Sequence, residues 1–204
     1  MRSNREMNRR KRETTKHKMK TIHIEQGTAS GLFSGDGSIR NPFMVSTAED
    51  VDRIFLHGYT NSTKPVRYAF GAGVFPFSGS WAMERQGYAH LRPGDQLIGS
   101  GMGVTTLKLT NPVMLTNGKK RPDVHGISVG DHRGSDFIAT SIVRDLTIDG
   151  NFAEHGADVF VTSGLRVYEG TAIIENVQVV GLCGSPVPVQ MPDGKRIGLE
   201  AFGI

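Results

Sequence analysis

The sequence lacks the features that mark disulfide-bonded or membrane-spanning proteins. Cys183 is its only cysteine, so no disulfide can form within the chain. No apolar run approaches the roughly 18 residues that a membrane-spanning helix needs, and we expect no membrane contact. Aromatic residues are sparse at 7%, whereas the 26 glycines are about twice the average share of roughly 7%. This composition favours a turn-rich all-β protein over a helical bundle.

The excess of positive charge is confined to the N-terminus. Residues 1–20 contain nine Lys or Arg against two Glu, and the rest of the chain has 15 basic and 18 acidic residues. The body is therefore not expected to bind nucleic acid. We expect residues 1–26 to form a disordered basic tail, with polyanion binding and a later start at Met19 as alternatives. No secretory signal is recognised, because no apolar stretch of about 7–15 residues follows the basic segment.

One short helix is expected near residue 50. Ser46–Glu49 matches a capping box, and apolar residues recur at helical spacing from Ala48 to Phe55, until Gly58 ends the pattern. We therefore expect residues 27–65 to form an entry loop and a capping helix. The apolar face of this helix would cover the open start of the β-structure that follows.

Short β-type runs begin at Val66, and two of the patterns repeat. Val143–Asp149 recurs as Ile174–Val180 after 31 residues. A second pattern recurs at offsets of 38 and 34 residues, in Gly126–Val129, Gly164–Val167 and Gly198–Ala201. Units of this size without a helix exclude βαβ crossovers and fit strands stacked about 4.8 Å apart in successive coils. The expected fold is an all-β parallel β-helix (solenoid) over residues 66–204.

The alternation within these repeats assigns side chains to two faces of each strand. Inward positions are expected to stack as Leu146 over Val177, Ile148 over Val179, Ile127 over Leu165, and Val129 over Val167. Outward positions are expected to be Ser128, Thr147, Arg166, Gln178 and Glu200. The aligned Asp145 and Asn176 are expected to satisfy backbone groups at a turn. Because the last coil lacks its second strand, we expect the solenoid to be incomplete at its C-terminus and to self-associate through the open coil.

Two segments resemble motifs of the pectate-lyase-like superfamily. They are Leu97–Leu107, which contains Gly99-Ser100-Gly101-Met102-Gly103, and Asp145–Asn151. The resemblance implies a right-handed parallel β-helix, contact with a polysaccharide and an extracellular location. Lyases, glycoside hydrolases, phage tailspikes and non-catalytic members share these motifs. The Asn-Thr-Asp, Asp-Asp, Gly-His-Gly and Arg-Ile-Lys signatures of polygalacturonase-like members are absent, so enzyme status stays open.

One turn carries a candidate catalytic site. Aligning Gly126 with Gly164 places Asp131 over Glu169, so two carboxylates are expected about one strand spacing apart, where they could bind calcium or share a proton. His132 follows in the same turn and Arg166 lies nearby, which completes the candidate catalytic set of Asp131, Glu169, His132 and Arg166. The alternative is an ordinary charged turn, with Arg166 paired to Glu200.

Further residues are candidates for substrate contact. Trp81 and Tyr88 could stack on sugar rings, or pack against the first coil, and Arg133 could pair with a uronate carboxylate. His125 and His132 show no paired spacing that would indicate a metal site. The leading hypothesis is a polysaccharide-interacting β-helix, the N-terminal part of a lyase or hydrolase that acts on a uronic-acid polymer. The alternative is a non-catalytic structural or adhesive module.

Overall fold

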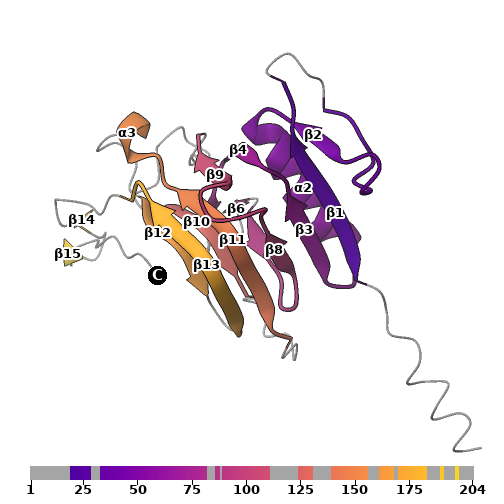
Figure 1. Cartoon of the computed structure of the whole chain (residues 1–204). Coiled ribbons are helices and arrows are strands. Elements are labelled where there is room, and N and C mark those ends of the chain that lie inside the picture. Colours follow the sequence, from indigo (N-terminus) through magenta and orange to yellow (C-terminus); the bar gives the residue numbers. More distant parts are fainter. Residues whose placement is uncertain are drawn as a thin grey trace, which may run out of the picture.

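The computed structural model describes residues 19–28, 33–81, 86–87, 89–110, 124–130, 139–155, 161–167, 170–182, 189–190 and 196–197. Strands dominate these segments, and Figure 1 shows the longer strands side by side, from β1 at one end to β12 and β13 at the other. This part of the chain also contains helix α2 (Ala48–Asn61) and the single turn α3 (Phe152–His155). Neither helix is long and apolar enough to cross a membrane.

The larger sheet is parallel throughout. It consists of β1 (Lys20–Gln26), β2 (Phe43–Val45), β3 (Val66–Phe70), β4 (Gly73–Phe77), β8 (Gln96–Ile98), β9 (Thr105–Leu109), β11 (Ser141–Asp149) and β13 (Ala172–Val180). The strands follow the order β2, β1, β3, β8, β11 and β13, while β4 and β9 continue the sheet beside the second half of β11.

The smaller sheet is centred on β10 (Val124–Val129). Its parallel neighbours are β12 (Val161–Val167) and β7 (His90–Leu91). A short hairpin of β5 (Ser80–Trp81) and β6 (Gln86–Gly87) joins β10 in antiparallel orientation. The separate antiparallel pair β14 (Val189–Gln190) and β15 (Arg196–Ile197) completes the described strands.

The predicted repeat registers are confirmed where the structure describes them. β11 pairs with β13 from Ser141 opposite Ala172 to Asp149 opposite Val180, which is the offset of 31 residues. β10 pairs with β12 at the offset of 38 residues, from Ile127 opposite Leu165 to Val129 opposite Val167. Each pass of the chain through this region therefore adds one strand to each sheet. The third occurrence of the glycine pattern, Gly198–Ala201, lies outside the described residues.

The long strands of the larger sheet bend at one aligned position. Asp145 in β11 and Asn176 in β13 adopt left-handed backbone angles, with φ of 59° and 52°. Asn and Asp tolerate this conformation better than most residues. Asn176 Nδ2 donates to Asp145 Oδ1 at 3.0 Å, so the stacked pair stabilises the bend. Before the bend β11 pairs with β8, and after it with β9.

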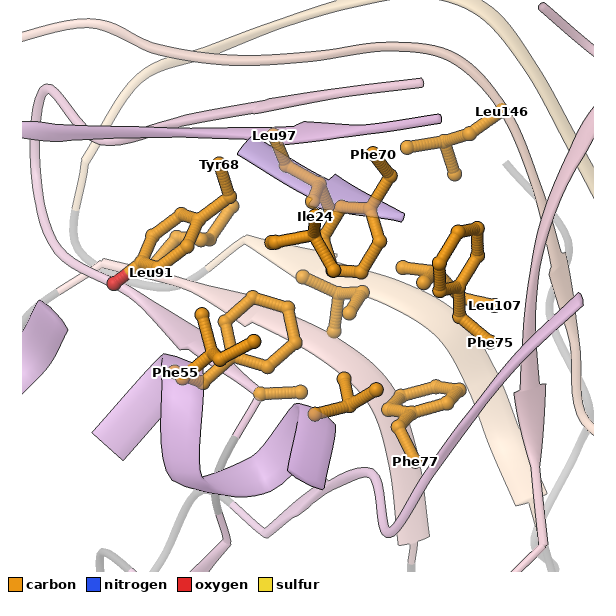
Figure 2. Close-up of a cluster of buried hydrophobic side chains, with 14 of the residues drawn as sticks. Ile24, Phe55, Tyr68, Phe70, Phe75, Phe77, Leu91, Leu97, Leu107 and Leu146 are labelled. Carbon is orange, nitrogen blue, oxygen red and sulfur yellow. The ribbon is translucent and has the colours of Figure 1, made fainter. Parts of the chain in front are cut away.

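Apolar side chains from both sheets and from α2 form one core. Figure 2 shows Phe55 of α2, Leu91 of the smaller sheet and residues of the larger sheet such as Tyr68 gathered in one cluster. Phe70 and Phe75 meet edge to face, with ring centroids 4.9 Å apart. Each such side chain contributes roughly 1.5–3 kcal/mol when fully buried. The core therefore holds both sheets and α2 in place, and with them the side chains on the outer face of each sheet.

Most of the predicted inward residues are buried, but the outward faces differ from expectation. Thr147 and Ser128 were expected to point into solvent and are 5% and 0% exposed. The Thr147 hydroxyl accepts from Gly103 N at 3.0 Å and donates to Gln178 Oε1 at 3.3 Å, so the turn before β9 covers it. Val167 was expected to be buried and is 40% exposed, because it lies at the end of β12 with a described strand on one side only.

Helix α2 forms as expected, but both of its ends differ from the prediction. Its N-cap is Thr47, whose side chain accepts from the backbone N–H of Asp50, one residue later than the predicted capping box. The helix continues past Gly58 to Asn61. Phe55 packs on Tyr68 of β3, with ring centroids 5.0 Å apart, so α2 covers the inner face of the larger sheet. The expected covering of the open start of the β-structure stays a prediction.

The expected boundary of the basic tail at residue 26 is wrong. Lys20–Gln26 is strand β1, and it pairs in parallel with both β2 and β3. Ile22 and Ile24 are 2% and 0% exposed. The strand stack therefore begins before the helix in sequence and not at Val66. The alternation of apolar and polar residues in β1 is short and directly follows the basic N-terminal residues. The strand was therefore assigned to the basic tail.

Candidate functional site

Most of the predicted site residues lie outside the described residues. They are Tyr88, Asp131, His132, Arg133 and Glu169. Trp81 is described through its backbone alone, as the last residue of β5. The ladder between β10 and β12 is observed up to Val129 opposite Val167, two positions before Asp131 and Glu169. The alignment that suggested the carboxylate pair is therefore confirmed up to this point, and the pair itself stays a prediction.

Arg166 is the predicted catalytic residue that the structure describes in full. It lies half-buried on β12, and its Nη1 contacts Nε2 of His125 on the neighbouring strand β10. His125 is 2% exposed, and its Nδ1 lies 2.7 Å from the hydroxyl oxygen of Ser163. The alternative partner considered from the sequence, Glu200, lies outside the described residues. Arg166, His125 and Ser163 thus form a connected polar cluster.

The hydrogen-bond donors in this cluster define the protonation state of His125. A guanidinium has only N–H donors, so Nε2 of His125 must accept from Arg166. The remaining ring proton then resides on Nδ1 and is donated to Ser163. A general base for Ser163 would need an unprotonated ring nitrogen facing the hydroxyl. In this arrangement His125 and Ser163 therefore position Arg166 and do not form an activated nucleophile.

A row of polar residues crosses three strands beside this cluster. Ser128 on β10 is paired in register with His90 on β7 and with Arg166 on β12, each about 4.8 Å away. Among the described residues, Ser128 is fully buried and its hydroxyl has no hydrogen-bond partner. A buried hydroxyl without a partner costs about 1–3 kcal/mol. We define the outer polar row as His90, His125, Ser128, Ser163 and Arg166.

Arg166 is the member of the outer polar row that can contact an anion. Arg166 carries a permanent positive charge and can bind a carboxylate through two parallel hydrogen bonds. Within the described segments, no three His, Cys, Asp or Glu residues lie close enough to hold a metal ion.

Sequence reasoning found Arg166 but missed most of its neighbours. The 38-residue offset already places Ser163 on His125 and Arg166 on Ser128, so these neighbours could have been found from the same alignment. Instead, His125 was weighed only as a metal ligand. His90 could not have been found in this way, because β7 has two residues and shows no repeat pattern.

The remaining buried charges have structural partners. Asp95 is fully buried and accepts from the backbone N–H of Val66 at 2.7 Å and of Arg92 at 2.9 Å. Arg92 also donates to the carbonyl oxygens of Ser62 and Lys64. This network fastens the segment after α2 to the turn before β8. The network therefore stabilises the fold. The outer polar row remains the candidate binding site.

Comparison with known proteins found no relative of this chain. The chain matches no family model, no curated protein and no solved structure.

Proposed function

We propose that the chain forms coils of a right-handed parallel β-helix and binds an acidic polysaccharide through the outer polar row. The observation that supports this proposal most is the position of Arg166, which is half-buried on β12, lies beside His125 and pairs in register with Ser128. The parallel registers at offsets of 31 and 38 residues support the coil arrangement. The resemblance of Leu97–Leu107 to the pectate-lyase-like superfamily supports the choice of a polysaccharide.

An acidic sugar fits this row better than a neutral one. The carboxylate of a uronate can form a two-pronged contact with a guanidinium, and such charge-assisted hydrogen bonds are about twice as strong as neutral ones. A β-helix repeats this outer face at each strand spacing, so an extended polymer could contact several strands at once.

Cleavage of the polymer is a further part of the proposal. If the β10–β12 register continues past Val129 and Val167, Asp131 and Glu169 would supply oxygen ligands for one calcium ion. His132 would then be available as a base, and Arg133 as a second carboxylate partner. Calcium-dependent release of unsaturated products that is lost in Asp131→Ala would support catalysis. Binding without release would instead support a polysaccharide-binding module.

Binding can be tested by affinity electrophoresis in gels that contain polygalacturonate or neutral dextran. We expect retardation by polygalacturonate alone, and at least a tenfold weaker affinity for Arg166→Ala. Arg166→Lys keeps the charge but loses the forked geometry, so its affinity should be intermediate. Arg53→Ala is the matched control, because Arg53 is exposed on α2 and paired with Glu49. Equal retardation of the wild-type protein and Arg166→Ala would overturn the proposal.

A structural or adhesive module is the second candidate, and the edge of β13 favours it. β13 pairs with β11, and no other described strand pairs with it. Its inward residues Ile174, Val177 and Val179 are only partly buried, and Ile173 on the other face is 45% exposed. Open strand edges of this kind promote association between chains. Light scattering that shows concentration-dependent assembly, together with no polygalacturonate binding, would favour this second function.

A further inference from the structure

A small cavity lies beside β1, away from the residues of the outer polar row. Its volume is about 240 Å³, and it is bounded by β1, the turn at residues 36–38, β2 and α2. The lining residues that matter here are Lys20, Ile22, Asp36, Ser38, Phe43 and His57. Ligand pockets for larger molecules have volumes of about 300–1,000 Å³, so this cavity suits one small ring.

The turn that forms one wall is held in place by its own hydrogen bonds. Gly37 O accepts from His23 N on β1 at 2.8 Å, and Asp36 N donates to Asn41 O at 3.0 Å. Asp36 Oδ1 accepts from the backbone N–H of Ser38 at 2.8 Å. A wall that is ordered before a ligand arrives adds little entropic cost to binding.

An apolar surface forms another part of the cavity. Gly37 has φ of 76°, and a Cβ atom there would lie 2.8 Å from the Phe43 ring and 3.2 Å from Ile22 Cγ2. The turn can therefore lie this close to Phe43 only because residue 37 is a glycine. The Phe43 ring also stacks on Phe33, with centroids 5.1 Å apart and planes at 19°. Both contacts fix the orientation of the ring.

The polar groups of the cavity require a ligand that both donates and accepts hydrogen bonds. The N–H of Ser38 lowers the pKa of Asp36, so its carboxylate stays ionised and acts as an acceptor. Lys20 can only donate. Asp36 would repel an inorganic anion, and Lys20 would repel a bare cation. Sugar hydroxyls both donate and accept, and the C–H face of a sugar ring can cover Phe43 and Ile22.

We propose that this cavity binds one neutral monosaccharide unit. Asp36 and Lys20 would bind its hydroxyl groups, and Phe43 would contact its apolar face. The site shares no residue with the outer polar row, so the two proposals can fail separately.

Saturation-transfer NMR on the full chain tests this site with the methyl glycosides of glucose, galactose and mannose. At least one glycoside should bind saturably, with a Kd of roughly 1–10 mM, which is about −3 to −4 kcal/mol. Asp36→Asn retains an oxygen for the Ser38 N–H but loses the charge, so affinity should fall at least fivefold. Lys20→Met should weaken binding similarly. Glu49→Gln, on the exposed face of α2, should bind like the wild-type protein.

Arg166→Ala separates this site from the proposed polysaccharide site. This variant should lose polygalacturonate and keep the glycoside. The inference is overturned if none of the three glycosides binds, or if Asp36→Asn and Lys20→Met both bind as tightly as the wild-type protein. Loss of glycoside binding in Arg166→Ala, with Asp36→Asn unaffected, would also overturn it and would assign the sugar to the smaller sheet.

Discussion

Asp52 of α2 joins the helix to the turn that follows β4. Its carboxylate is 5% exposed and accepts from the backbone N–H of Ser78 at 3.1 Å and from its hydroxyl at 2.5 Å. Burial raises the pKa of Asp52 to about 6 from 3.8, and repulsion by Glu49 adds to this effect, although both Ser78 bonds act against it. Near neutral pH the folded protein therefore bears the cost of an ionised buried carboxylate.

This raised pKa predicts a pH-dependent stability. A folded-state pKa above the unfolded value contributes stability that is complete below pH 3.8 and is lost as the pH rises through about 6. Asp52 alone should make the protein about 1 kcal/mol more stable at pH 5 than at pH 7.5. Thermal melts of the wild-type protein and Asp52→Asn at both pH values measure this difference. An identical pH response in the two proteins would show that Asp52 does not titrate as described.

At the scale of elements, helix α2 depends on a glycine that its sequence pattern cannot explain. A Cβ atom on Gly58 would lie 1.9 Å from the hydroxyl oxygen of Tyr68. Tyr68 is fully buried on β3, and among the described residues its hydroxyl has no hydrogen-bond partner. The glycine therefore allows close packing of the helix on the sheet and does not end the helix.

Gly58→Ala should destabilise the protein by about 1–3 kcal/mol through overpacking. At an exposed helical site the same change would instead stabilise by about 1 kcal/mol, so the sign of the effect is diagnostic. Tyr68→Phe removes the unpartnered hydroxyl and should be neutral or slightly stabilising. Denaturant unfolding of both single variants and the double variant measures their coupling. A stabilising Gly58→Ala, or full additivity with Tyr68→Phe, would contradict the packing described here.

The pairing of a strand could be predicted where its sequence pattern repeats in a second strand. Strands without such a repeat could not be paired from the sequence. Val143–Asp149 and Ile174–Val180 share an apolar pattern at one offset, which fixed both their pairing and their inward residues. β1 has a short alternation of its own, but its parallel partners, β2 and β3, share no recognisable sequence with it. The burial of Thr147 also could not be foreseen, because it depends on where the turn around Gly103 lies.

At the scale of the whole molecule, parallel pairing of strands far apart in the sequence places polar residues in a row across the smaller sheet. The sequence predicted that Arg166 would face outward, and the structure adds His125, Ser163, Ser128 and His90 around it. These residues are separated by up to 76 positions along the chain, so only the stacking of strands brings them together. The outer polar row is therefore a product of the fold, and no local motif encodes it.

Amide NMR during titration with trigalacturonate tests most directly whether the outer polar row binds an acidic polysaccharide. We predict saturable shift changes at Ser128, Ser163 and Arg166, including the side-chain Nε–H of Arg166, and no such changes in Arg166→Ala. An absence of shift changes at high trigalacturonate concentration, or changes confined to the larger sheet, would contradict binding at the outer polar row.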